Sequence, residues 1–507
     1  MRVNPLRRAY IAGESWFNLS FAGLNPLYHL GTLTFFFFWI ILITGIYLFL
    51  PFKGSIDGAY HSVEWMTHKQ WYVAGVMRSL HRYASDAAII TMLLHLFREF
   101  SQDRHRGTRW YSWVTGIPLL WMVVPLGITG YWLVWDQLAQ YIATGSAQLL
   151  DAIPIFFGSM ATNFLPGQIS DRFFTLIEFL HLLGQPLVLV FALWFHVRRI
   201  SNVNIMPPRG LAIGSFIALL ALSLLKPAIS HEQADLGIVP QTLNLDWFYL
   251  NIYPLLDYWT AGEVWLLTVG ITVLLIFLPW LPPKRSKAAA VVDLDNCDGC
   301  KQCFEDCPYD AITVQARTDG KKHKHEVVVD PALCTGCGIC VGACHSANPF
   351  RRAEKQLSPG IDMPGFPVHE LRSQTLAAIE AMKGEHKILV YGCDHGYAMR
   401  QLHTDNTRGI SLYCSGMLPP TMIGYALKNG ADGVLVSGCR TNDCYNRFGE
   451  RWTEMRIVSE REPHLRARVD HRHTISQGAG PTDRREIEQA LIRLREKLVK
   501  LEQKANG

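Results

Sequence analysis

Four histidines lie inside long apolar segments, where an ionisable or metal-binding side chain is costly and is usually functional. His81 and His95 are 14 residues apart in one segment. His181 and His196 are 15 residues apart in another. At a rise of 1.5 Å per residue, each pair spans roughly 21 to 22 Å of helix, and about four turns return its members to nearly one face. Two imidazole pairs at matching depths predict two bis-histidine haem sites, although a single histidine of this kind can simply join two helices by a hydrogen bond.

Glycine pairs with the same spacing accompany these histidines. Gly31 and Gly45 are 14 residues apart in the first apolar segment, and Gly116 and Gly130 are equally spaced in the third. A residue without a side chain lets a flat macrocycle approach the backbone. Small residues also serve close helix packing in lipid, so the glycines support the haem prediction without establishing it.

The elements that must position these residues are membrane helices, which need about 20 predominantly apolar residues each. Six stretches qualify: 29–50, 79–97, 112–135, 173–197, 210–226 and 262–282. Lys and Arg concentrate in the loops on one side: Arg2, Arg7, Arg8, Arg98, Arg104, Arg106, Arg109, Arg198, Arg199, Arg209, Lys284, Arg285 and Lys287. Because cytoplasmic loops are enriched in such residues, we expect both termini in the cytoplasm and a multi-pass protein of the cytoplasmic membrane. The polar N-terminus shows no cleavable signal peptide.

Composition divides the chain in two, because all 12 cysteines follow residue 296. With the orientation above they lie in a reducing compartment, where metal ligation is favoured over disulfides. The net charge is only +5. No continuous basic stripe is present, so nucleic-acid binding is not expected.

Long stretches of the apolar half resemble the short cytochrome b of cytochrome bf complexes. The resemblance lies in VMRSLHRYASDAAIITMLLHLFREF (76–100), WVTGIPLLWMVVPLGITGYWLVWDQ (113–137) and DAIP (151–154). It implies two b haems held by the four histidines. It also implies that Arg78, Arg82 and Arg109 lie near the haem propionates; the alternative is that these arginines anchor helix ends to lipid head groups.

The segment NLDWFYLNIYPLL (244–256) resembles the Pro-Glu-Trp-Tyr segment of the family's outer quinol-oxidation site. Asp246 stands where the glutamate would be, which implies a catalytic general base for a quinol proton; the alternative is an exposed acidic loop residue. The likeness has departures: Leu245 and Val134 replace prolines, and the family's last helix is missing. His29 stands where that family attaches an extra haem through cysteine, so no covalently bound haem is expected.

Two cysteine runs follow the membrane half. Residues 297–307 read C-x2-C-x2-C-x3-C-P, and residues 334–344 repeat the spacing, followed by His345. This doubled spacing is typical of two-cluster 4Fe-4S ferredoxins, in which the fourth cysteine of each run ligates the other cluster. The expected ligand sets are Cys297, Cys300, Cys303 and Cys344 for one cluster, and Cys334, Cys337, Cys340 and Cys307 for the other. A zinc ribbon would need only two C-x2-C pairs.

A third cysteine region contains Cys393, Cys414, Cys439 and Cys444 and begins with the strand-like run KILVYGC (387–393). Its segments LYCSGMLPP (412–420) and NGADGVLVSGCRTNDCYNRFG (429–449) resemble the iron-sulfur delta subunit of methyl-viologen-reducing hydrogenases. The resemblance implies one 2Fe-2S cluster, although Gly396 occupies the position of the family's second cysteine. Four thiolates suit zinc as well.

The expected fold is a membrane all-α bundle of about six transmembrane helices, followed by a cytoplasmic α+β ferredoxin-like domain and an α/β iron-sulfur domain. The domain boundaries are 1–210 for the haem bundle, 211–286 for two further helices that resemble a shortened quinol-site subunit, 287–357 for the ferredoxin domain, 358–480 for the delta-like domain and 481–507 for an amphipathic C-terminal helix.

The leading functional hypothesis is a quinone-linked oxidoreductase subunit of a larger complex. It would exchange electrons between membrane quinone or quinol and a cytoplasmic flavoprotein or heterodisulfide-reductase-like partner through two b haems, two 4Fe-4S clusters and one 2Fe-2S cluster. Two alternatives stay open: a bf-like core that works with a Rieske protein or a c-type cytochrome, and a non-catalytic anchor for a soluble redox complex. Neither the direction of electron flow nor a dimeric state follows from the sequence.

Overall fold

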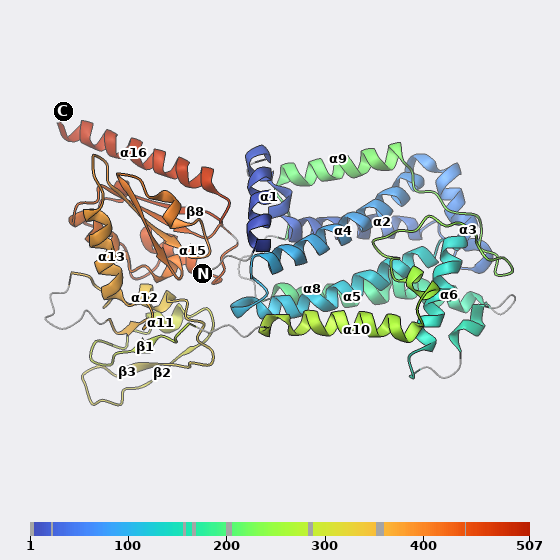
Figure 1. The fold of residues 1–507 in the computed structure, drawn as a ribbon, viewed down its shortest axis with the longest axis horizontal. Helices are drawn as coiled ribbons and strands as arrows, with labels where there is room; N and C mark the ends of the chain where they lie inside the picture. Colours follow the sequence, from blue (N-terminus) through green and yellow to red (C-terminus); the bar gives the residue numbers. More distant parts are fainter. Residues whose placement is uncertain are drawn as a thin grey trace. The chain divides into compact units, whose positions relative to one another are not determined.

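The computed structural model describes residues 5–21, 24–155, 159–164, 169–198, 205–281, 287–350, 359–441 and 443–506. The chain divides into two compact units (Figure 1). The first comprises residues 1–10 and 19–282, and the second comprises residues 11–18 and 283–507. The first unit contains the four histidines of the predicted haem sites, and the second contains all the cysteines.

Each of the six predicted membrane segments contains a helix. They are α2 (Leu30–Phe49), α4 (Val76–Ser101), α5 (Trp110–Trp132), the continuous run of α7 (Asp171–Phe179), η7 (Leu180–Gly184) and α8 (Gln185–Val197), α9 (Arg209–Leu225) and α10 (Ala261–Phe277). The remaining α-helices described before residue 282 are α1 (Pro5–Phe21), α3 (Ile56–Glu64) and α6 (Gln137–Asp151). The N-terminal half is therefore helical, as predicted.

Four of these segments are long and apolar enough to cross a membrane: Leu30–Phe49, Gly107–Trp132, Asp171–Val197 and Ala261–Trp280. The other two fall outside that set for different reasons. Helix α4 has 26 residues, but polar side chains such as Arg78, Arg82 and Asp86 lower its mean hydropathy. Helix α9 is apolar but has only 17 residues. The count of six crossings stays a prediction.

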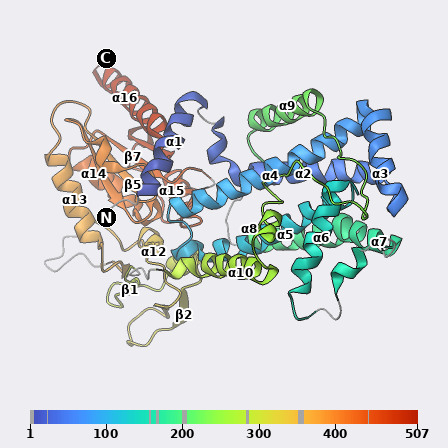
Figure 2. The same cartoon turned by 45° about the vertical axis from the view of Figure 1, so that its right-hand side comes forward.

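The helices that carry histidines pack lengthwise against the helices that carry the paired glycines. Helix α4 lies along α2, and α8 lies along α5, as Figure 2 shows. Helix α9 contacts α4, and α10 contacts α5. In this pairing, each predicted haem ligand faces a neighbouring helix at a glycine, where that helix has no side chain.

The first part of the second unit is built from short elements around cysteine loops. Strands β2 (Ile312–Ala316) and β3 (His325–Val329) form an antiparallel hairpin, and β1 (Val291–Val292) pairs with β4 (Ile361–Asp362). Two helices of one turn, α11 (Gln302–Glu305) and α12 (Ile339–Ala343), each begin within a cysteine run. The loops, rather than long elements, therefore hold the thiols.

A four-stranded parallel sheet forms the rest of this unit. Its strands are β5 (Ile388–Cys393), β6 (Thr407–Leu412), β7 (Gly433–Gly438) and β8 (Thr474–Gly478), in the order β6-β5-β7-β8. Every residue of β5 and β7 is buried, as expected for parallel strands covered by helices on both faces. The chain leaves β5 toward β6 and returns to β7 on the other side, so β5 marks a topological switch point, where α/β folds place their ligands.

Four helices accompany this sheet: α13 (Val368–Glu380), α14 (Pro420–Lys428), α15 (Gly449–Ile457) and α16 (Arg484–Asn506). The last of them is the predicted C-terminal amphipathic helix. Its apolar residues, including Ile487, Leu491 and Leu494, form one buried cluster with Val390 and Leu435 of the sheet. Helix α16 therefore packs on its own domain.

Candidate redox centres

Each of the four histidines lies against one of the four predicted glycines. A Cβ atom added to Gly45 would lie 3.0 Å from Cε1 of His81, and one added to Gly31 would lie 3.4 Å from Cε1 of His95. The second helix pair repeats this arrangement. The corresponding distances are 2.9 Å between Gly130 and His181 and 3.3 Å between Gly116 and His196.

Backbone carbonyls fix the orientation of the imidazole rings. The Nδ1 atom of His81 lies 3.0 Å from the Ile41 carbonyl oxygen, and Nδ1 of His181 lies 3.0 Å from that of Leu126. In both cases the acceptor is four residues before the glycine that the ring contacts. A histidine that donates its Nδ1 proton in this way presents Nε2 to a metal.

Three threonines complete this arrangement, and the sequence analysis did not single them out. The hydroxyl groups of Thr44, Thr129 and Thr115 lie 3.0, 3.1 and 3.2 Å from Nδ1 of the histidines that face them. Each threonine immediately precedes one of the glycines. The repeated Thr-Gly pair is therefore the local signal that could have revealed these residues.

The rings of His81 and His181 face each other. The ring centroids of His81 and His181 are 6.3 Å apart. Imidazole nitrogens bind metals at about 2 Å, and the distance from each nitrogen to its ring centre accounts for the remainder. The separation therefore suits one metal ion between the two rings.

A π-helical turn explains how spacings of 14 and 15 residues reach the same depth. His181 lies in η7, a π-helix over Leu180–Gly184, whereas His81 and His95 share the uninterrupted α-helix α4. A π turn contains one more residue than an α turn. The extra residue between His181 and His196 therefore adds little to the distance between them along the helix. Pro186 lies two residues after the end of this turn and cannot donate the backbone hydrogen bond of a regular α-helix.

The three arginines predicted near the propionates contact protein groups. Arg78 donates to the Ser230 hydroxyl at 2.8 Å and also contacts the Thr67 hydroxyl. Arg109 lies 3.8 Å from Glu99. Their assignment to propionates stays a prediction.

The third of these arginines belongs to a buried polar group around Asp246. Nη2 of Arg82 lies 3.0 Å from Oδ2 of Asp246, and the Tyr131 hydroxyl donates to the same oxygen at 2.7 Å. Asp246 is 8% exposed, so it is not the solvated loop residue that the sequence left as an alternative. Arg82 also pairs with Asp86 of its own helix, a residue that the sequence analysis missed.

The eight ferredoxin cysteines form two groups that match the crossed pairing expected from the sequence. A small cavity is lined by the four sulfur-bearing residues of one set: Cys307, Cys334, Cys337 and Cys340. Cys303 lies close to the other three members of its own set: Cys297, Cys300 and Cys344. Each group thus combines three cysteines of one run with the fourth of the other, and both fit a cluster with four thiolate ligands.

The delta-like cysteines meet at the carboxyl edge of the parallel sheet. Cys393 ends β5, Cys414 follows β6, and Cys439 follows β7, so the sheet itself brings them together. The sulfur atoms of Cys393 and Cys439 are 3.6 Å apart, and Cys444 adjoins both Cys414 and Cys439. Four buried or half-buried thiols in one place fit either a 2Fe-2S cluster or zinc.

Gly396 explains why a fifth cysteine is absent from this centre. A Cβ atom at residue 396 would lie 2.9 Å from the carbonyl oxygens of Gly438 and Ala479. The backbone around the centre therefore leaves no room for a side chain, and Cys393 is the thiol that the segment supplies.

Desolvation opposes the ionisation of several ferredoxin thiols. Desolvation raises the pKa of Cys300 and of Cys337 to about 11, and it raises the pKa of Cys340 well above the ordinary value. Thiolates in these positions need a compensating positive charge, which a bound metal provides.

The ferredoxin part and the sheet domain share a close contact beside these centres. Helix α12 packs on the turn after Cys414, where the Gly416 carbonyl lies so near Gly342 that no side chain would fit. The Asp306 carboxylate, from the first cysteine run, pairs with Arg456, which is buried, and accepts a hydrogen bond from Arg461 at 2.8 Å. The two predicted domains are therefore joined by a buried ion-pair network.

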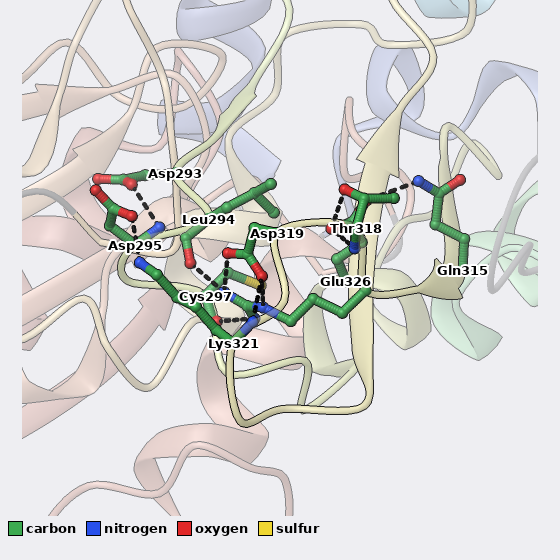
Figure 3. Close-up of polar contacts among 10 residues, drawn as sticks. Asp293, Leu294, Asp295, Cys297, Gln315, Thr318, Asp319, Lys321 and Glu326 are labelled. Atoms are coloured by element: carbon green, nitrogen blue, oxygen red, sulfur yellow. Dashed lines mark hydrogen bonds and ion pairs between the residues drawn. The ribbon is translucent and has the colours of Figure 1, made fainter.

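An arginine on the β2–β3 hairpin clamps the first cysteine loop. Arg317 donates to the carbonyl oxygen of Cys297 at 2.6 Å and also contacts that of Leu294. Figure 3 shows these carbonyls beside Asp319, with which Arg317 forms an ion pair. Lys321 of the same hairpin forms an ion pair with Asp295, which precedes Cys297 in the loop. Arg317 and Lys321 therefore connect the hairpin to the loop at two points.

Comparison with known families identifies three segments of the chain. Residues 18–203 match the family described as "Cytochrome b/b6/petB", residues 296–348 match "4Fe-4S dicluster domain", and residues 385–501 match "Methyl-viologen-reducing hydrogenase, delta subunit". A solved chain titled "Hyperthermophilic respiratory Complex III" is similar at a TM-score of 0.43 and 18% identity, covering 55% of this chain and 82% of that one.

The family matches support a membrane electron-transfer subunit that carries haem b and iron-sulfur clusters. The chain joins a cytochrome b segment, a 4Fe-4S dicluster segment and a hydrogenase delta-subunit segment, and all three resemblances read from the sequence are confirmed.

Proposed function

We propose that the chain is the quinone-linked subunit of a multi-subunit redox complex of the cytoplasmic membrane. Two b haems, two 4Fe-4S clusters and one 2Fe-2S cluster would supply the electron chemistry, while the protein sets their positions and potentials. The four histidines would hold the haems, and the twelve cysteines would hold the clusters in the three groups described above. Asp246 would exchange protons with quinol on the outer side.

One observation carries the proposal: the third cysteine centre adjoins a ferredoxin centre within a single folded unit. Cys414 of the delta-like segment lies near Cys337 of the ferredoxin segment, and Lys287 lies near both. The ammonium group of Lys287 lies 3.6 Å from the centre of the Tyr413 ring and 3.9 Å from Asp394. Two thiol sites that lie near one another and near the same lysine suit direct electron transfer from one cluster to the next.

This adjacency also suggests the order of the centres. The ferredoxin set that contains Cys337 is the one beside the delta-like site, so the set that contains Cys344 would be the more distant carrier. The delta-like centre would then exchange electrons with a cytoplasmic flavoprotein or heterodisulfide-reductase-like partner.

The experiment uses the purified chain, loaded with haem and clusters and reconstituted in vesicles. Quinol is added, and haem absorbance and the electron paramagnetic resonance of the clusters are followed. We expect quinol to reduce the haems and the redox state of the clusters to change with them. If quinol changes no centre while dithionite reduces them all, the chain is an anchor for a soluble complex. If electrons reach the clusters only after a Rieske protein is added, the bf-like alternative holds.

A further inference from the structure

Asp86 is a carboxylate in the middle of α4, and the proposed electron route does not use it. Within a membrane segment such a group is costly and is usually paired or functional. Its side chain is 18% exposed, and its carboxylate pairs with Arg82 one turn earlier. The guanidinium of Arg82 contacts Asp86 through Nη1 and Asp246 through Nη2, so the two carboxyl groups flank one cation.

The oxygens of Asp246 are already engaged by donors. The Phe248 backbone N–H donates to Oδ1 at 2.8 Å, while Oδ2 takes the Tyr131 hydroxyl and the Arg82 guanidinium. The guanidinium carbon of Arg82 also lies 5.1 Å from the centre of the Tyr131 ring. Arg82 is therefore held between the two carboxyl groups.

One cation and two carboxyl groups meet around Asp86. The ionisable side chains that face Asp86 are Arg82, Asp246, Tyr83, Tyr131 and Tyr249, from α4, α5 and the loop after residue 244. Tyrosines are neutral at ordinary pH, so one cation faces two carboxyl groups. Two carboxyl groups that flank one cation away from water do not both ionise readily, so we expect the pair to hold one proton.

We propose that Asp86 and Asp246 form a carboxyl pair that shares one proton and transfers quinol protons at the outer site. The inference rests on the proposed function and adds Asp86 to it. Quinol oxidation releases two protons and two electrons, one of each per step. In each step one O–H bond of the quinol or its one-electron product breaks, one O–H bond forms on Asp246, which passes the proton on before the next step, and one electron would leave to haem held by His81 and His181. Asp86 acts through Asp246, which makes it a positioning residue. The pair returns the proton if quinone is reduced at this site.

The test compares Asp86→Asn, Asp86→Glu and the control Asp57→Asn, which changes an exposed carboxylate on α3. We expect Asp86→Asn to keep both haems and to reduce them with quinol at least about tenfold more slowly, because Asp246 loses its carboxyl partner and a positioned general base contributes roughly 10²–10⁴ in rate. Its rate should also lose the pH dependence of wild type. Asp86→Glu should restore most of the rate, and Asp57→Asn should match wild type.

An infrared readout separates this inference from the proposed function. Dithionite-driven redox difference spectra, recorded in H2O and D2O, report a protonated carboxyl group even when quinol does not react. We expect a deuterium-sensitive carboxyl band in wild type and its loss in Asp86→Asn. A band that persists in Asp86→Asn would overturn the shared proton, as would a wild-type pH profile in that variant. If quinol does not reduce the haem of the wild-type protein, the proposed function is rejected. The infrared band then still tests whether Asp86 and Asp246 hold a proton.

Discussion

The Cβ position of Gly130 lies 2.9 Å from Cε1 of His181, and the hydroxyl of the preceding Thr129 lies 3.1 Å from Nδ1 of the same ring. A side chain at residue 130 would therefore meet the imidazole ring directly. The absence of that side chain, together with the Thr129 and Leu126 contacts, fixes where the ring can lie. Gly45, Thr44 and Ile41 make the same contacts with His81, so the two facing rings have matching surroundings.

Gly130→Ala should displace His181 and lower the content of the outer haem. The added methyl group would lie closer to Cε1 than real Cβ atoms ever lie, so the ring or the helix must move. Haem is counted by pyridine haemochrome, and the two haems are distinguished by redox titration. Gly270→Ala on α10 is the matched control, because nothing lies within 4 Å of its Cβ position. Equal haem content in the two variants would contradict the role of the glycine.

His95→Ala should remove only the inner haem, because its partner His196 then lacks the opposite ligand. The outer pair of His81 and His181 is left intact, so the haem content should fall to half.

Acidified acetone should extract all haem from wild type, since residues 1–296 contain no cysteine for covalent attachment. Two haems retained by the variant, or haem left on the chain after extraction, would refute these assignments.

Arg317→Met should weaken the first ferredoxin centre. Methionine keeps much of the side-chain volume but cannot donate to the Cys297 and Leu294 carbonyls, so the loop that presents Cys297 loses its clamp. We expect one 4Fe-4S signal to be lost first during air exposure or chelation, while the other persists. Arg472→Met, which removes an exposed ion pair with Asp470, is the control. Clusters that decay in parallel in both variants would argue against the clamp.

The sequence predicted the residues of the centres better than the residues that hold them. Repeated spacings within single helices or loops made the histidines, glycines and ferredoxin cysteines visible, and the structure brings each predicted group together. Asp306 and Arg456 are 150 positions apart, so no local pattern connects them. Asp86 was missed because its importance depends on Asp246 in a distant loop. The π turn at His181 likewise depends on backbone hydrogen bonds that the residue types do not specify.

Lys287→Met should lower the reduction potentials of the two centres beside it. A positive charge stabilises the reduced, more negative state of a cluster, so its removal favours the oxidised state. A screened interaction of about 1 kcal/mol corresponds to roughly 40 mV for one electron. Titration monitored by electron paramagnetic resonance should show this shift in the delta-like centre and its ferredoxin neighbour, and none in the haems. Lys428→Met is the matched control, because Lys428 also lies over an aromatic ring, that of Phe350. Potentials that match the control would show that Lys287 does not lie beside two redox centres.

Changing both Cys439 and Cys444 to Ser should remove the third centre alone. These residues follow β7 at the carboxyl edge of the sheet and face Cys393 and Cys414, whereas the ferredoxin thiols belong to separate loops. We expect haem absorbance and both 4Fe-4S signals to persist, a distinct 2Fe-2S signal to disappear, and electron transfer to the cytoplasmic partner to stop. Because buried ion pairs and α16 hold the sheet domain independently of these thiols, the domain should remain folded by circular dichroism. Zinc with no third cluster in the wild-type protein, or undiminished transfer in the double variant, would make the domain a structural docking module.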